Sequence, residues 1–151
     1  MMFSKSCEYA LRAVIHLSME SHNGSRLNIK EIASKIGTPE PFTAKILQIL
    51  SRQGIISSQK GPGGGFYIDP QAPHIPVITV IDAIDGKNTL ERCGLGLKVC
   101  SSSHPCPIHH EFRPYADKLK DLVSEKTVQD LAVGVKQGKY FLNNLTAELA
   151  S

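Results

Sequence analysis

The chain has 151 residues, of which 41% are hydrophobic and 21% charged, a composition typical of globular proteins. It contains no run of about 18 apolar residues and no signal-peptide pattern, so we expect a cytoplasmic protein without a membrane span. The net charge is +3, and residues 1–70 hold the whole excess, with 8 Lys and Arg against 5 Asp and Glu. Positive charge confined to the first half is compatible with contacts to DNA phosphates there.

Two helices are predicted at the start of the chain. Apolar residues at helical spacing indicate one helix over residues 4–21 and another over residues 29–36. Asn28 is the expected N-cap of the second helix, because Glu31 follows it at the capping-box position. Gly37 is the expected end of that helix.

A third helix is predicted directly after Gly37. We expect Thr38 to be its N-cap, Pro39 to occupy its first position, and Gly54 to end it. Its apolar residues recur at helical spacing: Phe42, Ile46, Leu47 and Leu50. Two helices joined by a short turn that contains glycine indicate a helix-turn-helix.

A β-hairpin is predicted after the third helix. The β-prone segments Ile55–Ser58 and Phe66–Ile68 flank the sequence KGPGGG, which suits a glycine-rich hairpin tip. The glycines do not follow the order of a nucleotide-phosphate loop, and they lead into a strand rather than a helix. Residues 1–72 are therefore predicted to form a winged helix-turn-helix domain, with double-stranded DNA as the partner.

The candidate DNA contacts come from the second helix of the motif and from the wing. In this fold the N-terminal end of that helix enters the major groove, and wing residues contact the backbone or the minor groove. Arg52 and Ser51, at the end of the helix, are candidate phosphate contacts. An alternative is that these polar side chains are only the solvated face of a small helical domain. The principal candidates are Thr38, Glu40, Thr43, Lys45, Gln59, Lys60, Gly63 and Gly64.

The second half, residues 73–151, is predicted to contain a short helix over residues 76–86 and then a loop over about 87–106. A long helix begins at Pro107, and Thr127 caps another helix, with Asp130 at the capping-box position. Residues 136–151 are weakly patterned. The apolar stripe of the long helix is too large for so small a chain to bury alone, and we expect it to form a homodimer: Ile108, Phe112, Tyr115, Ala116, Leu119, Leu122 and Val123.

The loop carries three cysteines, Cys93, Cys100 and Cys106, and His109 follows the last of them by three residues. Thiolate and imidazole are good ligands for zinc and for the irons of an iron–sulfur cluster. The alternative is that the three cysteines are chance thiols. Three cysteines so close together in a polar loop do not fit that alternative well. The close Cys-x2–4-Cys pair of common zinc sites is absent, which favours a cluster.

The spacing of the cysteines does not identify the fourth ligand of the metal site. His109 has the right adjacency, and His104 and His110 are its rivals. Glu8, early in the first helix, is another candidate, since it could reach the loop of a partner subunit. Cys7 is expected to be a buried or half-buried thiol, and its position next to Glu8 keeps it among the candidates.

Taken together, the motifs SCEYALRAVIHL, IKEIASKIG, PFTAKILQIL and KGPGGGFYI, the cysteine loop and the TVQDL helix resemble the iron–sulfur winged-helix repressors typified by IscR and NsrR. The resemblance covers nearly the whole chain. It implies a dimer built on the long helix and a cluster, 2Fe–2S favoured and 4Fe–4S possible, on the three loop cysteines. By the same resemblance, His109 stands at the IscR-type histidine ligand, and Glu8 at the carboxylate of nitric-oxide and redox sensors.

The expected fold is mainly α: a winged helix-turn-helix with a cysteine loop and a long C-terminal dimerisation helix. The expected function is that of a dimeric DNA-binding repressor that senses iron–sulfur, redox or nitric-oxide status, and not that of an enzyme. One alternative is a DNA-binding regulator that depends on zinc or thiol redox chemistry. An alternative of another class is a cluster or sulfur transfer protein, although the sequence lacks a nucleotide loop and a recognisable general base.

Overall fold

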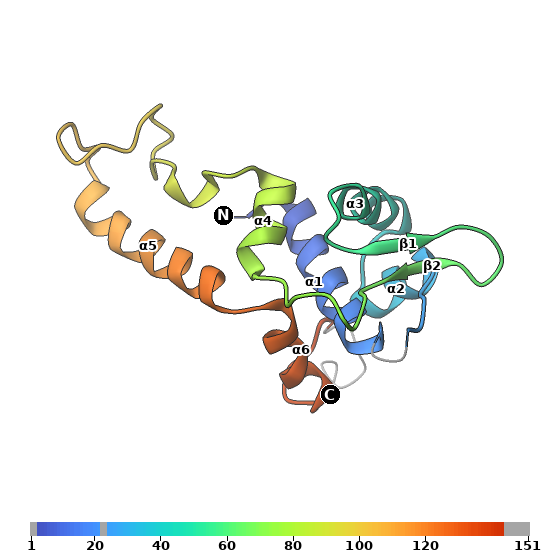
Figure 1. Ribbon diagram of the computed structural model, residues 1–151. Helices are drawn as coiled ribbons and strands as arrows, with labels where there is room; N and C mark the ends of the chain where they lie inside the picture. Colours follow the sequence, from blue (N-terminus) through green and yellow to red (C-terminus); the bar gives the residue numbers. More distant parts are fainter. Residues whose placement is uncertain (1–2, 22–23, 144–151) are drawn as a thin grey trace, which may run out of the picture.

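The computed structural model describes residues 3–21 and 24–143 and is mainly helical, as predicted (Figure 1). Helix α1 is central, with the helix-turn-helix and the hairpin on one side and the second half of the chain on the other. In chain order the elements are α1 (Lys5–Glu20), α2 (Ile29–Ile36), α3 (Glu40–Arg52), β1 (Ser57–Gln59), β2 (Gly65–Tyr67), α4 (Val77–Asp85), the 3-10 helix η2 (Thr89–Glu91), α5 (His109–Glu125) and α6 (Val128–Lys136).

Local side-chain caps define several helix ends, as the sequence predicts. The Asn28 side chain accepts a hydrogen bond of 2.8 Å from the Glu31 amide at the start of α2. Gly37 ends that helix with φ 69°, in the left-handed region where glycine is favoured. Thr127 and Asp130 form a complete capping box at the start of α6.

Several predicted boundaries are wrong by small amounts, and one predicted cap is wrong. Pro39, not Thr38, is the N-cap of α3, and it makes no side-chain cap bond. The strands β1 and β2 pair antiparallel from Ser57 with Tyr67 to Gln59 with Gly65. Both strands therefore lie closer to the tip of the hairpin than predicted, and Ile68 is outside the second strand. Helix α5 begins at His109, two residues after Pro107, because Cys106 and Pro107 still belong to the preceding turn.

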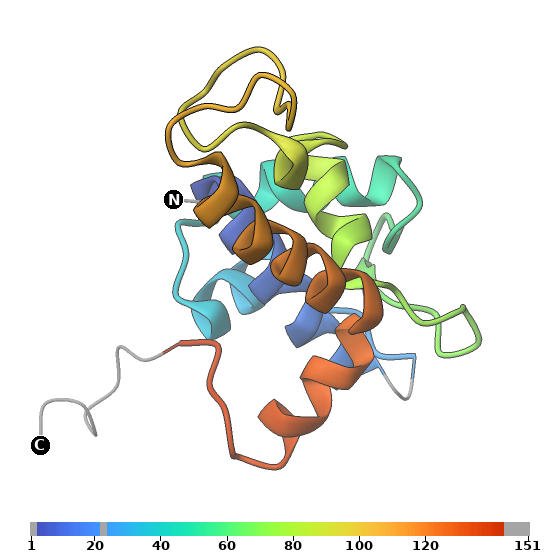
Figure 2. The same ribbon diagram turned by 90° about the vertical axis from the view of Figure 1, so that its left-hand side faces the viewer.

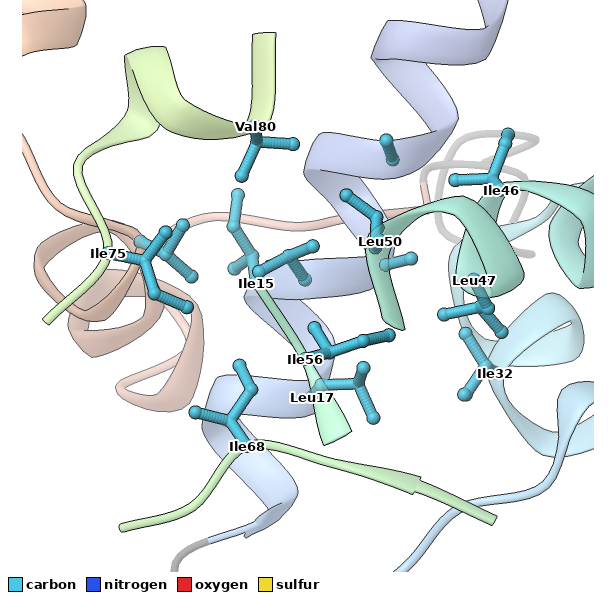
Figure 3. Packing of buried hydrophobic residues seen from close by; sticks show 14 of the residues in the cluster. Ile15, Leu17, Ile32, Ile46, Leu47, Leu50, Ile56, Ile68, Ile75 and Val80 are labelled. Carbon is cyan, nitrogen blue, oxygen red and sulfur yellow. The ribbon is translucent and has the colours of Figure 1, made fainter. Parts of the chain in front are cut away.

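The main hydrophobic core surrounds α1 and draws on both halves of the chain (Figure 3). Leu17, Ile32 and Leu50 from the first half are fully buried, and Val80 and Val128 from the second half are buried with them. Each such side chain contributes about 1.5–3 kcal/mol through removal from water. The main core therefore contains residues from both sides of the predicted boundary at residues 72 and 73.

Helix α5 stands away from this core. It packs on α4 and η2, while the cysteine loop extends from its N-terminal end (Figures 1 and 2). In Figure 2, which looks onto α5, none of the other described elements covers its outer side. Within the described parts of the chain, none of the helices is long and apolar enough to cross a membrane.

Candidate nucleic-acid interface and metal centre

The turn between α2 and α3 is closed by two threonines that sequence reasoning assigned to DNA. The hydroxyl groups of Thr38 and Thr43 lie 2.6 Å apart and share a hydrogen bond, and the Thr43 hydroxyl also donates to the Pro39 carbonyl at 2.9 Å. Both side chains are buried. Their burial is a correction to the expected DNA contacts, because their hydroxyl groups hold the turn and do not face solvent.

The outer face of α3 carries the side chains that remain available to DNA. Pro41, Lys45, Gln48 and Arg52 are all exposed, and their spacing of four, three and four residues places them on one stripe of the helix. Phe42, expected in the core, is 58% exposed beside this stripe. The face thus combines two cations, an amide and an aromatic ring.

A groove of about 590 Å³ lies between α3 and the wing. The predicted contacts Gln59 and Lys60 lie on its wing side, and Glu40 stays exposed at the opposite end of α3. The residues lining the groove are mostly polar or basic: Gln48, Ser51, Arg52, Ser58, Gln59, Lys60, Gly65 and Phe66. The helix and the wing therefore present one continuous surface.

The tip of the wing depends on glycine for its shape. A Cβ atom at Gly64 would lie 2.2 Å from the Gln59 carbonyl oxygen, and Gly63 has φ 75°. The Gly64 amide donates to the Gly61 carbonyl at 2.9 Å. Gly64 therefore shapes the turn. We predicted that Gly64 contacts DNA, but its amide is already bonded within the turn and is not available to a phosphate.

In the cysteine loop, Cys93 and Cys106 are both buried, and their side chains interact with each other. The Leu95 amide donates to Cys93 Sγ at 3.4 Å. Backbone N–H bonds from Leu95 and Leu97, together with contacts to the Cys106 side chain and the Gly96 amide, lower the pKa of the Cys93 thiol. The loop backbone thus stabilises negative charge on this sulfur.

Cys100 and His109 form a second pair. Cys100 Sγ lies 3.4 Å from Nδ1 of the buried His109, and the guanidinium of Arg113 donates to the same sulfur at 3.4 Å. His109 is placed by the first turn of α5, where its amide donates to the Cys106 carbonyl at 3.0 Å. The turn that positions the histidine therefore also connects the two pairs.

The four predicted ligands thus form two pairs, with the three cysteines in the loop and His109 at the first residue of α5. Within residues 3–21 and 24–143, no group of three or more His, Cys, Asp or Glu side chains is arranged to hold a metal ion. A single tetrahedral zinc ion needs four donors around one point, which this arrangement does not supply. A 2Fe–2S cluster needs two protein ligands at each of two irons, and two donor pairs match that requirement.

The rival ligands lie outside the two pairs. His104 is exposed and bonds to Ser103, and His110 is exposed with its ring edge-on to that of His109. Glu8 on α1 forms an ion pair with Lys5 at 3.5 Å. Cys7 is fully buried, as predicted, and burial beside Asp85 raises the pKa of its thiol to about 12.

Sequence reasoning missed Arg113 and the exposure of Phe42. Arg113 follows His109 by four residues, so both lie on one face of α5, and that spacing was the available signal. Phe42 gave no signal, because its apolar character and helical spacing are those of a core residue.

A winged helix with a cysteine loop and a projecting helix defines a class of DNA-binding regulator, and comparison with known proteins agrees. The family model of Rrf2, an iron-dependent transcriptional regulator, matches residues 3–134. The chain belongs to the Rrf2 family of transcriptional regulators.

Individual relatives support the same family. A protein of Aquifex aeolicus that is named as an HTH-type transcriptional regulator is 33% identical over 134 residues, covering 87% of this chain and 91% of its own. The regulator IscR of Pectobacterium atrosepticum is 27% identical over 123 residues, 82% of this chain and 74% of that protein. The fold is that of CymR, the global cysteine regulator of Bacillus subtilis, with a TM-score of 0.70 at 20% identity over 87% of this chain and 95% of CymR.

Proposed function

We propose that this regulator is a homodimeric repressor whose operator binding responds to a 2Fe–2S cluster on Cys93, Cys100, Cys106 and His109. The observation that carries the proposal is the pairing of the four donors, Cys93 with Cys106 in the loop and Cys100 with His109 at the start of α5. The Leu95 amide donates to Cys93 Sγ, and N–H bonds of this kind to the ligand sulfurs support and tune iron–sulfur clusters. A bound cluster would supply a centre that oxidants or nitric oxide can alter.

The DNA contacts follow from the exposed face of α3. Lys45 and Gln48 are placed to reach base edges or phosphates in the major groove, and Arg52 to reach the backbone. Lys60 on the wing would reach the adjacent backbone or minor groove. Phe42 adds an apolar contact that suits the methyl group of thymine.

A second copy of the chain is the proposed partner of α5. The outer face of this helix has Ile108, Tyr115 and Leu122 at steps of seven residues, and their exposed fractions are 37%, 76% and 51%. Phe112 and Leu119 lie between them at steps of four and three. Such a stripe is typical of the seam of a helix pair. Leu119 also packs against the buried cluster of this chain, whereas the outer side of α5 is not covered by the other described elements (Figure 2).

The colour of the protein tests the cluster directly. Purified without oxygen, or reconstituted with iron and sulfide, the protein should be brown with visible charge-transfer bands. Replacing Cys93, Cys100 or Cys106 by Ala should remove them, whereas Cys7→Ala should not. His109→Ala and Glu8→Ala test the fourth ligand, and we expect only the first to change the spectrum. A colourless protein that holds one zinc ion would overturn the proposal.

A second candidate, a thiol-redox regulator, is favoured by one observation. Cys93 and Cys106 are in contact, and the amides around Cys93 favour the thiolate that oxidation requires. If this candidate holds, mild oxidation of the colourless protein should join these two sulfurs and change operator affinity. Mass spectrometry of the peptides would then show a disulfide between these two cysteines.

A further inference from the structure

Arg113 makes an unusual set of contacts for a residue near a helix start. Its guanidinium donates to Cys100 Sγ at 3.4 Å, to the carbonyl of Leu90 at 2.5 Å and to that of Glu91 at 3.4 Å. It also pairs with Asp117 at 3.0 Å, and its side chain is only 19% exposed. One cation therefore joins the cysteine loop, η2 and α5.

The turn that Arg113 holds leads directly to the DNA-binding half. The Thr89 hydroxyl in η2 donates to the Asp85 and Gly86 carbonyls at the end of α4, at 3.1 and 2.9 Å. The Asp85 carboxylate in turn accepts bonds from the amide and hydroxyl of Ser4, the N-cap of α1.

Helix α4 also contacts α3, the helix that carries the proposed DNA-binding face. The Gln53 side chain at the end of α3 donates to the Ala83 carbonyl at 3.2 Å. A continuous set of bonds thus runs from Cys100 through Arg113, η2 and α4 to α1 and α3.

We propose that Arg113 is the positioning residue that connects Cys100 to this path, so that occupancy of the cysteine site sets the position of η2 and α4. The proposal rests on the cluster function above. Arginine suits the role because its planar guanidinium holds Nη1 and Nη2 apart in a fixed geometry, and these reach a sulfur and two carbonyl oxygens at once. A lysine ammonium presents its donors from a single nitrogen and lacks this fixed fork. An N–H bond to a ligand sulfur also secures that ligand on the metal.

Three variants of the full-length protein test the role. Arg113→Gln removes the charge and most of the fork, and Arg113→Lys keeps the charge alone. Lys118→Gln is the matched control, because it removes an equal charge from an exposed position of the same helix. Circular dichroism first checks that each variant is folded.

The first measurement uses reconstituted protein and the loss of visible absorbance in the presence of an iron chelator. We expect Arg113→Gln and Arg113→Lys to lose the cluster about 10–100-fold faster than wild type, and Lys118→Gln to match wild type. The ratio of operator affinities with and without cluster should shrink toward one in both Arg113 variants. Wild-type rates and ratios in both would overturn the proposal.

The second measurement uses the ligand-free protein and therefore does not depend on the cluster. Hydrogen exchange of the amides of residues 86–93 should be faster in both Arg113 variants and unchanged in Lys118→Gln. If wild type accepts no cluster, the proposed function fails, and this exchange result still decides whether Arg113 holds the turn. Unchanged exchange in the Arg113 variants would show that it does not.

Discussion

At the scale of single residues, an exposed aromatic ring on a helix that enters the major groove is matched to the methyl group of thymine. In the proposed complex with DNA, Phe42 would be such a ring, beside the stripe of Lys45 and Gln48. Once an operator has been selected from random duplexes, single thymines in it can be replaced by deoxyuridine. At the position that Phe42 reads, this change should cost wild type about 0.8 kcal/mol per half-site, or about fourfold in affinity.

In Phe42→Ala the same base change should have no effect, so the two changes form a double-mutant cycle. Phe141→Ala removes an aromatic ring of similar exposure near the other end of the chain and should behave like wild type. If no thymine position loses its effect in Phe42→Ala, this residue does not read a methyl group.

His16 predicts a pH dependence of stability. It is buried, its Nε2 has no hydrogen-bond partner among the described residues, and burial lowers its pKa from 6.5. The folded state therefore binds fewer protons than the unfolded state, so stability is complete above about pH 6.5 and is lost as the pH falls below it. The slope from one such group is at most about 1.4 kcal/mol per pH unit.

Urea unfolding between pH 5 and pH 7 measures this slope. His16→Gln should show a smaller loss of stability on acidification than wild type. His104→Gln, at an exposed position, should keep the wild-type slope. Equal slopes for wild type and His16→Gln would contradict the assignment.

At the scale of elements, the wing is expected to act through charge. Lys60→Ala should weaken binding to all duplexes alike and flatten the dependence of affinity on salt by about one unit for each phosphate that is no longer neutralised. Lys136→Ala, an equal loss of charge on α6, should leave the slope unchanged. If Lys60→Ala keeps both affinity and slope, the wing does not bind DNA through this lysine.

The outer face of α5 predicts the oligomeric state. Tyr115→Glu combined with Leu122→Glu places two charges in the proposed seam and should give monomers with weak operator binding. Both side chains are exposed in the single chain, so the subunit itself should stay folded. Light scattering reports the mass, and Val133→Glu, at an exposed apolar position of α6, is the control that should stay dimeric.

The same scale shows what the sequence could predict. The caps at Asn28 and Thr127 and the order of the elements were predictable, because each depends on residues a few positions apart. The pairing of Thr38 with Thr43 was not, because it depends on how the turn closes around Pro39. The role of Arg113 was not either, since it bonds to carbonyl groups more than twenty residues away.

At the scale of the whole molecule, the cysteine loop and the recognition helix lie at different ends of one bonded framework (Figure 1). The cysteine pairs lie beyond the start of α5, α4 lies between, and α3 carries the proposed DNA-binding face on the other side. In a dimer built on α5, a change at the loop would alter the angle of the winged domains and hence the half-site spacing they span. We therefore expect loop cysteine variants to change DNA binding while the dimer persists.

The most direct test of the central claim is an anisotropy titration of the selected operator, at fixed salt, with cluster-loaded protein and with chelator-stripped protein. We expect the two affinities to differ by about fivefold or more, the lower end of typical coupling between sites. Stripped Cys100→Ala should bind like stripped wild type. Equal affinities for the loaded and stripped proteins, with the dimer intact in both, would contradict the claim that the cysteine loop controls DNA binding.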